Sequence, residues 1–109
     1  MNEDNVQRHG DKALASIRTA LERFGADHPG AEVHAYRYNS VSVRIRILYH
    51  GFRGLSAEQR ENMVWPYLHA LDLETQNDIS MLLLMTEEEL QDPLAFASRE
   101  FDHPSPSML

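Results

Sequence analysis

The 109-residue chain contains no cysteine. Disulfide bonds, thiol nucleophiles and thiolate metal ligands within the chain are therefore excluded. The sequence also lacks any run of the roughly 20 apolar residues that a membrane-spanning helix needs. Its first residues, Met1 to Asp11, are polar and carry both charge signs, which is unlike a secretory signal. We therefore expect a cytoplasmic protein that does not act at a membrane.

Basic residues are also in short supply. Ten lysines and arginines stand against 17 carboxylates, which gives a net charge of −7 with neutral histidines. Broad binding of nucleic acid draws its affinity largely from basic side chains, so this balance argues against that class. The distribution is uneven, because acidic residues crowd 72–92 while half of the basic residues lie in the middle third. Those five are Arg37, Arg44, Arg46, Arg53 and Arg60.

Residues 41–50 carry the strongest local pattern, because apolar side chains alternate with mostly polar or charged ones. Such alternation is typical of a β-strand, in which successive side chains point to opposite faces of a sheet. One face of this central strand should be buried against helices. The other face, which carries Arg44 and Arg46, should point outward. The side chains expected on the buried face are Val41, Val43, Ile45, Ile47 and Tyr49.

A second strand is expected over 32–38, joined to the central strand by a tight turn at Asn39-Ser40. A two-residue loop would place Tyr36 opposite Val43. This register has a consequence for every side chain of the strand, because a slip of one residue inverts the two faces. It places His34, Tyr36 and Tyr38 on the buried face, and Val33, Ala35 and Arg37 on the outer face.

Helical patterns flank the two strands. Residues 11–24 and 57–71 each place apolar side chains three or four positions apart, which makes one apolar stripe on each helix. Ser56 and Gln59 have the spacing of a capping box at the start of the second helix. Pro66 removes a backbone donor and crowds the preceding turn, so it should kink or divide this helix.

The last third of the chain predicts a strand and a short helix. The apolar run 79–85 follows the helical crossover and should pair parallel to the central strand, after a polar connection over 72–78. Thr86 and Glu89 form a second capping-box pattern at the start of a short helix. Asp92-Pro93 can begin a further helix, because proline is tolerated at the first helical position.

Together these elements predict one α+β domain with a mixed three-stranded sheet and helices on one face. The expected order is helix, strand, strand, kinked helix, strand, helix. The domain should span 11–102, between a flexible leader over 1–10 and a flexible tail over 103–109.

The motifs give little sign of catalysis. The six histidines show no metal-ligand spacing, and no nucleophile motif surrounds Ser80. We therefore expect no enzyme, no metal site and no cofactor, with a hydrolase using His34 or His50 as the remaining enzymatic alternative. Gly51 and Gly54 match the Gly-x-x-Gly spacing of KH nucleic-acid loops. Here they follow a strand, so a tight strand-to-helix turn is the simpler interpretation.

Two segments resemble the BolA-like family. Residues 52–68 match a family pattern of Phe-x-Gly-x-Ser followed by Arg, Val and Leu at spacings of four. Residues 79–88 match the family's last strand and the threonine and acidic residues that follow it. With the first helix and the hairpin, the resemblance covers roughly 11–90. The residues that carry it are Phe52, Gly54, Ser56, Arg60, Val64, Leu68, Ile79, Leu82, Thr86, Glu87 and Glu88.

This resemblance implies a KH-like fold and a small adaptor that binds a monothiol glutaredoxin and helps to handle iron-sulfur clusters. Some family members are instead regulators that bind nucleic acid. The family's strand histidine, a cluster ligand, corresponds to Ser80 here, and a hydroxyl is a poor iron ligand. The loop that can supply a second ligand is reduced to about Asn39-Ser40. The fold should therefore carry over better than the cluster chemistry.

We expect a non-enzymatic binding module that acts through a protein partner, with a monothiol glutaredoxin as the family-based candidate. The alternatives are a KH-like regulator that binds nucleic acid through the arginines, and an interaction domain of an unrelated pathway. The row Arg37, Arg44 and Arg46 is either a solvated sheet face or a surface for an acidic or phosphate-bearing partner. The expected partner-binding residues are Arg37, Arg44, Arg46, Gly51, Arg53, Gly54 and Arg60.

Overall fold

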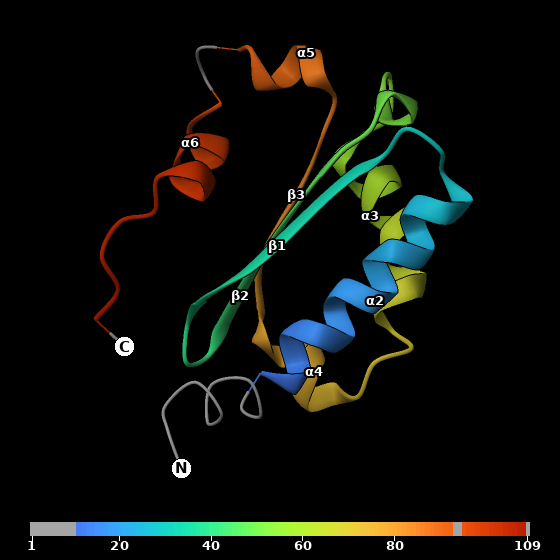
Figure 1. Cartoon of the computed structure of the whole chain (residues 1–109). Coiled ribbons are helices and arrows are strands. Elements are labelled where there is room, and N and C mark those ends of the chain that lie inside the picture. The colour runs from blue at the N-terminus through green and yellow to red at the C-terminus, as the bar shows by residue number, and fades with distance from the viewer. Residues whose placement is uncertain (1–10, 93–94, 109) are drawn as a thin grey trace.

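The computed structural model describes residues 11–92 and 95–108 of the chain (Figure 1). Its centre is a three-stranded sheet in the order β1-β2-β3. β1 (Glu32–Asn39) pairs antiparallel with β2 (Ser42–Leu48), and β3 (Ile79–Met85) pairs parallel with β2. The mixed α+β class and the parallel third strand are confirmed. The leader expected over 1–10 and the helix start expected at Pro93 fall outside the described residues.

Helices lie on both sides of this sheet (Figure 1). α2 (Lys12–Asp27) and α3 (Ala57–Leu68) cover one face, as expected, and α4 (Leu73–Asp78) leads from α3 into β3. α5 (Glu87–Leu90) follows β3, and α6 (Phe96–Asp102) then folds back over the opposite face of the sheet. The expectation that helices occupy one face therefore does not extend to α6. In the described part of the chain, every helix is too short or too polar to cross a membrane.

Local capping signals explain where several helices begin. Both predicted capping boxes form, one at Ser56 for α3 and one at Thr86 for α5. The connection expected over 72–78 instead forms α4 over 73–78. Asp72 caps this helix, because its side chain accepts from the Thr75 N–H at 2.7 Å. Pro66 does not divide α3, which ends only two residues later at Leu68.

The core lies between the sheet and the helices α2 and α3. Val43, Ile45 and Ile47 of β2 are fully buried, as predicted. The other face was predicted to be open, but Ser42, Arg46 and Leu48 are buried as well. Val41 was expected beside them, but it precedes β2 and is exposed. The side chains that meet β2 in this core are Ile17, Leu21, Phe24, Phe52, Val64 and Leu68.

The register between β1 and β2 differs by one residue from the expected one. Ala35 pairs with Ile45, and Tyr36 pairs with Arg44 rather than with Val43. The expected faces of β1 are therefore wrong: Val33 and Ala35 pack against the core, and His34, Tyr36 share the arginine face. The turn is Ser40-Val41 rather than Asn39-Ser40, and Tyr38 is an extra residue at an irregularity of β1. These two differences together shift the register by one residue and invert the faces of β1.

Candidate functional site

The arginine face of the sheet lies beneath α6. Arg46 is only 8% exposed, and its Nη1 donates to Ser98 Oγ at 2.8 Å and to Asp102 Oδ2 at 3.0 Å. Arg44 Nη1 donates to Glu100 Oε2 at 2.7 Å. The expectation that Arg44 and Arg46 point into solvent is therefore wrong, because α6 covers them. The acidic groups that meet these arginines belong to the same chain.

Aromatic contacts reinforce the attachment of α6. The Arg46 guanidinium lies 4.6 Å from the centroid of the Phe101 ring, and the Tyr36 hydroxyl donates to the Phe101 carbonyl at 2.7 Å. The hydrogen bond that Arg44 donates to Glu100 lowers the pKa of that carboxyl to about 2. Glu100 also accepts from the N–H and hydroxyl of Ser105, in the expected tail, at 2.9 and 2.7 Å. Thus α6 and the chain after it are tied to the sheet by several polar contacts.

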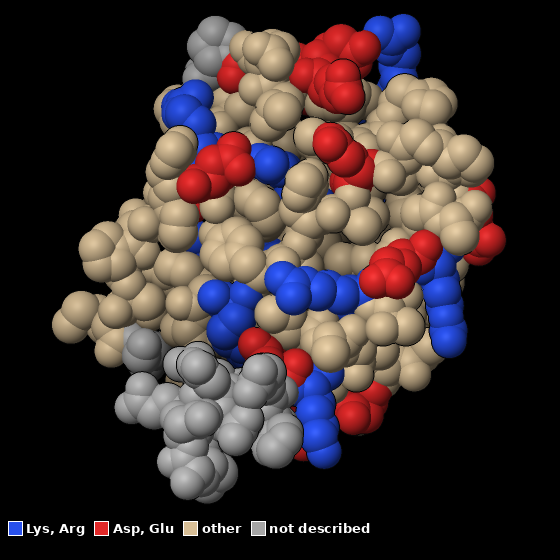
Figure 2. All heavy atoms as spheres, viewed as in Figure 1, with Lys and Arg blue, Asp and Glu red and all other residues tan. Residues whose placement is uncertain are grey.

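Each of the five predicted arginines forms an ion pair within the chain. Arg37 meets Asp11 at 2.9 Å and Asp78 at 3.2 Å, and the exposed Arg53 meets Glu88 at 3.0 Å. On the side of the molecule that Figure 2 shows, basic side chains lie interspersed with acidic ones and form no broad basic surface. Arg37 pairs with Val43 and so shares the face of the sheet opposite to that of Arg44 and Arg46, which breaks the predicted row. The predicted arginines are thus not gathered into one site.

The two loop glycines shape the turn between β2 and α3. Gly51 lies in the short 3-10 helix η1 (His50–Phe52), where a Cβ atom would come within 2.3 Å of the Tyr49 ring. Gly54 adopts a φ of +78°, a conformation that favours glycine. Both positions therefore have a structural reason to be glycine, which agrees with the interpretation of this loop as a tight turn.

Ser80 sits at an irregularity of β3. Val43 pairs with Ile79 and Arg44 pairs with Met81, so Ser80 is an extra residue on the edge strand. Its hydroxyl lies against the Ser42 hydroxyl. Across residues 11–92 and 95–108, no three histidine or carboxylate side chains gather closely enough to hold a metal ion.

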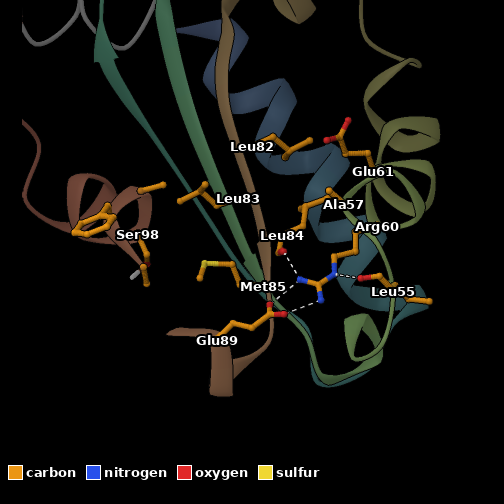
Figure 3. Close-up of a pocket in the computed structure, with 13 residues that line it drawn as sticks. Leu55, Ala57, Arg60, Glu61, Leu82, Leu83, Leu84, Met85, Glu89 and Ser98 are labelled. Atoms are coloured by element: carbon orange, nitrogen blue, oxygen red, sulfur yellow. Dashed lines mark hydrogen bonds and ion pairs between the residues drawn. The ribbon is translucent and has the colours of Figure 1, made fainter. Parts of the chain in front are cut away.

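A groove of about 520 Å³ runs along the outer edge of β3 (Figure 3). One wall is the start of α3, and the other is the segment that enters α6. Figure 3 shows Leu83 and Met85 on the side of α6, and Leu82 directed toward the other side. The lining residues are Leu55, Ala57, Arg60, Glu61, Leu82, Leu83, Leu84, Met85, Glu89, Ala95, Phe96, Ala97 and Ser98.

The floor of this groove is the backbone edge of β3. Within the described residues no further strand pairs with this edge, because β3 is last in the sheet order. The Met85 carbonyl accepts from the Tyr49 N–H at 2.9 Å and so points toward β2. Backbone groups of successive strand residues point to opposite edges, so those of Leu82 and Leu84 point into the groove. The Leu84 carbonyl agrees with this direction, since it accepts from Arg60 Nη1 at 2.9 Å.

Arg60 and Glu89 close one end of the groove with a two-bond ion pair, at 2.6 and 2.8 Å (Figure 3). Arg60 also donates from Nε to the Leu55 carbonyl at 3.1 Å. The hydrogen bonds from Arg60 lower the pKa of Glu89 to about 2. This pair links α3, the end of β3 and α5, and so it fixes the shape of the groove at that end.

Replacing Glu89 with glutamine tests this ion pair, because glutamine can keep the capping bond to Thr86 and removes only the charge. Solvent screens a side chain that is 43% exposed, so we expect a loss of about 1 kcal/mol at pH 7. A lowered folded-state pKa stabilises the protein above the unfolded pKa of about 4.3, and the stabilisation fades as pH falls toward 2. Urea unfolding should show that the difference in free energy of unfolding between wild type and Glu89→Gln is smaller at pH 3 than at pH 6. An equal difference at both pH values would contradict a stabilising role for the charge of Glu89.

The other end of the groove carries Glu61. This carboxylate is exposed, and no hydrogen bond or ion pair joins it to the described residues. Phe96 is 64% exposed on the opposite wall. The sequence indicated Arg60 as a binding residue but neither Glu61 nor Phe96. The uncharged run 79–85 is the sequence feature that relates to the groove. It indicates a groove only when β3 is known to lie at the edge of the sheet.

Comparison with models of known protein families finds no match to this chain, and a search of curated proteins finds none either. The resemblance to the BolA-like family therefore stays a prediction from the sequence.

Proposed function

We propose that this chain is a non-enzymatic binding module that holds a protein partner in the groove along β3. The supporting observation is the uncharged edge strand Ile79–Met85, whose outward backbone groups at Leu82 find no strand among the described residues. Natural proteins usually protect such an edge with charges, a proline or a covering segment. Here β3 contains neither a charged residue nor a proline. A partner bound in the groove would cover its edge.

The resemblance to the BolA-like family supports a more specific version, in which the partner is a monothiol glutaredoxin and the task is iron-sulfur handling. The segment 52–60, which leads into α3, carries part of the family pattern, and its residues Leu55, Ala57 and Arg60 line the groove. Ser80 weakens the cluster part of this version, because its hydroxyl lies against Ser42 in the place of the family's imidazole ligand.

Mixing the chain with a cluster-loaded monothiol glutaredoxin tests the specific version. Co-elution in size-exclusion chromatography with an unchanged visible spectrum is expected, because the partner would be bound without a ligand from Ser80. A changed spectrum would show that binding alters the environment or the ligands of the cluster, against this expectation. Separate elution of the two proteins would remove the glutaredoxin from the proposal.

Nucleic-acid binding through the arginine face is less well supported than protein binding. Arg44 and Arg46 are paired with Glu100 and Asp102, so a phosphate chain could reach them only after α6 had left the sheet. The net charge of −7 also opposes the approach of a polyanion.

Filling the groove tests the general proposal. Ala57 is exposed on the α3 wall, so Ala57→Trp should occupy the groove without disturbing the core. The matched control is Ala26→Trp, at an exposed position near the end of α2 and outside the groove. Proteins retained from the native cell lysate by immobilised wild type and by Ala26→Trp should be lost with Ala57→Trp. Retention of no protein by the wild type, or equal retention by all three, would overturn the proposal.

A further inference from the structure

The free edge of β3 presents backbone groups with the spacing that another strand would use. The Leu82 N–H, the Leu82 carbonyl and the Leu84 N–H face the groove in that order. The next group, the Leu84 carbonyl, is already taken by Arg60. The edge therefore offers a donor, an acceptor and a second donor, and the ion pair of Arg60 with Glu89 marks where pairing must stop.

The walls leave room for side chains on both faces of an added strand. The α3 wall begins at Ala57, and the opposite wall contains Ala95 and Ala97, so small side chains line both sides of the groove. Side chains of a neighbouring strand would lie beside those of β3, which are leucine and methionine over 81–85. An occupant with apolar, β-branched side chains would match this floor.

The charge of the groove selects among such occupants. Glu89 is paired with Arg60, whereas Glu61 has no ion-pair partner among the described residues. The whole protein carries −7. A cationic segment is therefore attracted to the groove and an acidic one is repelled. The same charges oppose a second copy of this chain, because pairing β3 with itself would bring together two proteins of equal negative charge.

We propose that the groove binds an extended, cationic peptide segment of another protein, which joins the sheet as a fourth strand beside β3. This inference rests on the proposed function and adds the chemistry of the partner. Main-chain hydrogen bonds to Leu82 and Leu84 supply pairing of the β-addition type. A lysine or arginine of the segment meets Glu61, and its apolar side chains lie between the two walls.

A selection from a displayed library of random dodecapeptides tests this chemistry with the full chain as bait. Peptides enriched by the wild type, and not by Ala57→Trp, should contain β-branched apolar residues at alternate positions, at least one lysine or arginine, and no central proline. Enrichment of acidic or proline-rich peptides, or no difference between the two baits, would overturn the inference.

Amide hydrogen exchange with the best enriched peptide then tests strand addition directly. Saturating peptide should slow exchange at the Leu82 and Leu84 amides at least tenfold, because both N–H groups become hydrogen-bonded. The Leu83 amide points toward β2 and should change little. A version of the peptide methylated at its central amides should bind at least tenfold more weakly. Equal binding by the methylated peptide would mean that side chains alone hold the ligand.

Charge variants complete the test. Glu61→Gln should weaken binding of the selected peptide about three- to fivefold. Glu58→Gln removes the same charge from the same helix but outside the groove, and should change binding less than about twofold. Another outcome is that lysate proteins are retained by wild type and lost with Ala57→Trp while the peptides fail these tests. That combination would support the proposed function and rule out strand addition. Protection of Leu82 and Leu84 without peptide, in a sample that sediments as a dimer, would assign the edge to a second copy.

Discussion

Phe52→Ala is expected to lower the free energy of unfolding by about 3–5 kcal/mol. Phe52 is fully buried, and its ring centroid lies 5.3 Å from that of Tyr49 and 6.3 Å from that of Phe24. Removing the ring leaves a cavity at the junction of the loop with α2 and α3, where these packed aromatic neighbours can collapse only partly. Urea unfolding at pH 7, followed by far-ultraviolet circular dichroism, measures the loss.

Phe96→Ala is the matched control for this cavity. The same atoms are removed, but from a side chain that is 64% exposed on the groove wall. We expect a change within about 0.5 kcal/mol, as for most surface substitutions. Losses of similar size in the two variants would mean that the packing of Phe52 against Phe24 does not hold the core together.

Arg46→Ala is expected to cost about 2 kcal/mol, because the guanidinium makes charge-assisted bonds beneath α6. The Ser98 hydroxyl, almost fully buried, loses its donor at 2.8 Å, and the Phe101 ring loses the cation above it. Asp102 is 47% exposed and can return to water, so the cost stays below that of an ion pair buried at both ends. Exchange at the His103 amide, which is bonded to the Arg99 carbonyl at 2.9 Å, should accelerate as α6 loosens.

Arg53→Ala provides the comparison, because Arg53 and Glu88 form an ion pair at the same 3.0 Å distance with side chains 75% and 64% exposed. A pair in water contributes little, so we expect a change within about 0.5 kcal/mol and no effect on α6. Unchanged exchange at His103 in Arg46→Ala would show that other contacts, such as that of Arg44 with Glu100, are sufficient to hold the helix.

Local signals accounted for most of the elements. The alternation over 41–50 predicted β2 and the burial of Val43, Ile45 and Ile47, and the apolar run 79–85 predicted β3 to the residue. The predicted register of β1 failed because it was inferred from a two-residue turn at Asn39-Ser40, whereas the turn is Ser40-Val41. The extra residue at Tyr38 was invisible to that argument. The predicted register buried the polar His34 and exposed the apolar Val33. The free-energy cost of that exchange would have indicated the correct faces of β1.

The sequence could not show what covers the arginines. Both charge signs are evident in it, but the contact between Arg46 and Asp102 joins residues 56 positions apart and depends on α6 crossing the sheet. For the same reason the groove was missed. One of its walls precedes β3 in the chain and the other follows it, so only the tertiary arrangement brings Ala57 and Ala97 to the same opening.

Ser98 belongs to two neighbourhoods at once, since its hydroxyl accepts from Arg46 and its side chain also lines the groove. The Arg46 contact therefore holds in place a residue of the groove wall. If the proposed peptide contacts this wall, its binding would stabilise the attachment of α6, and by linkage the loss of the Arg46 contact should weaken binding of the peptide.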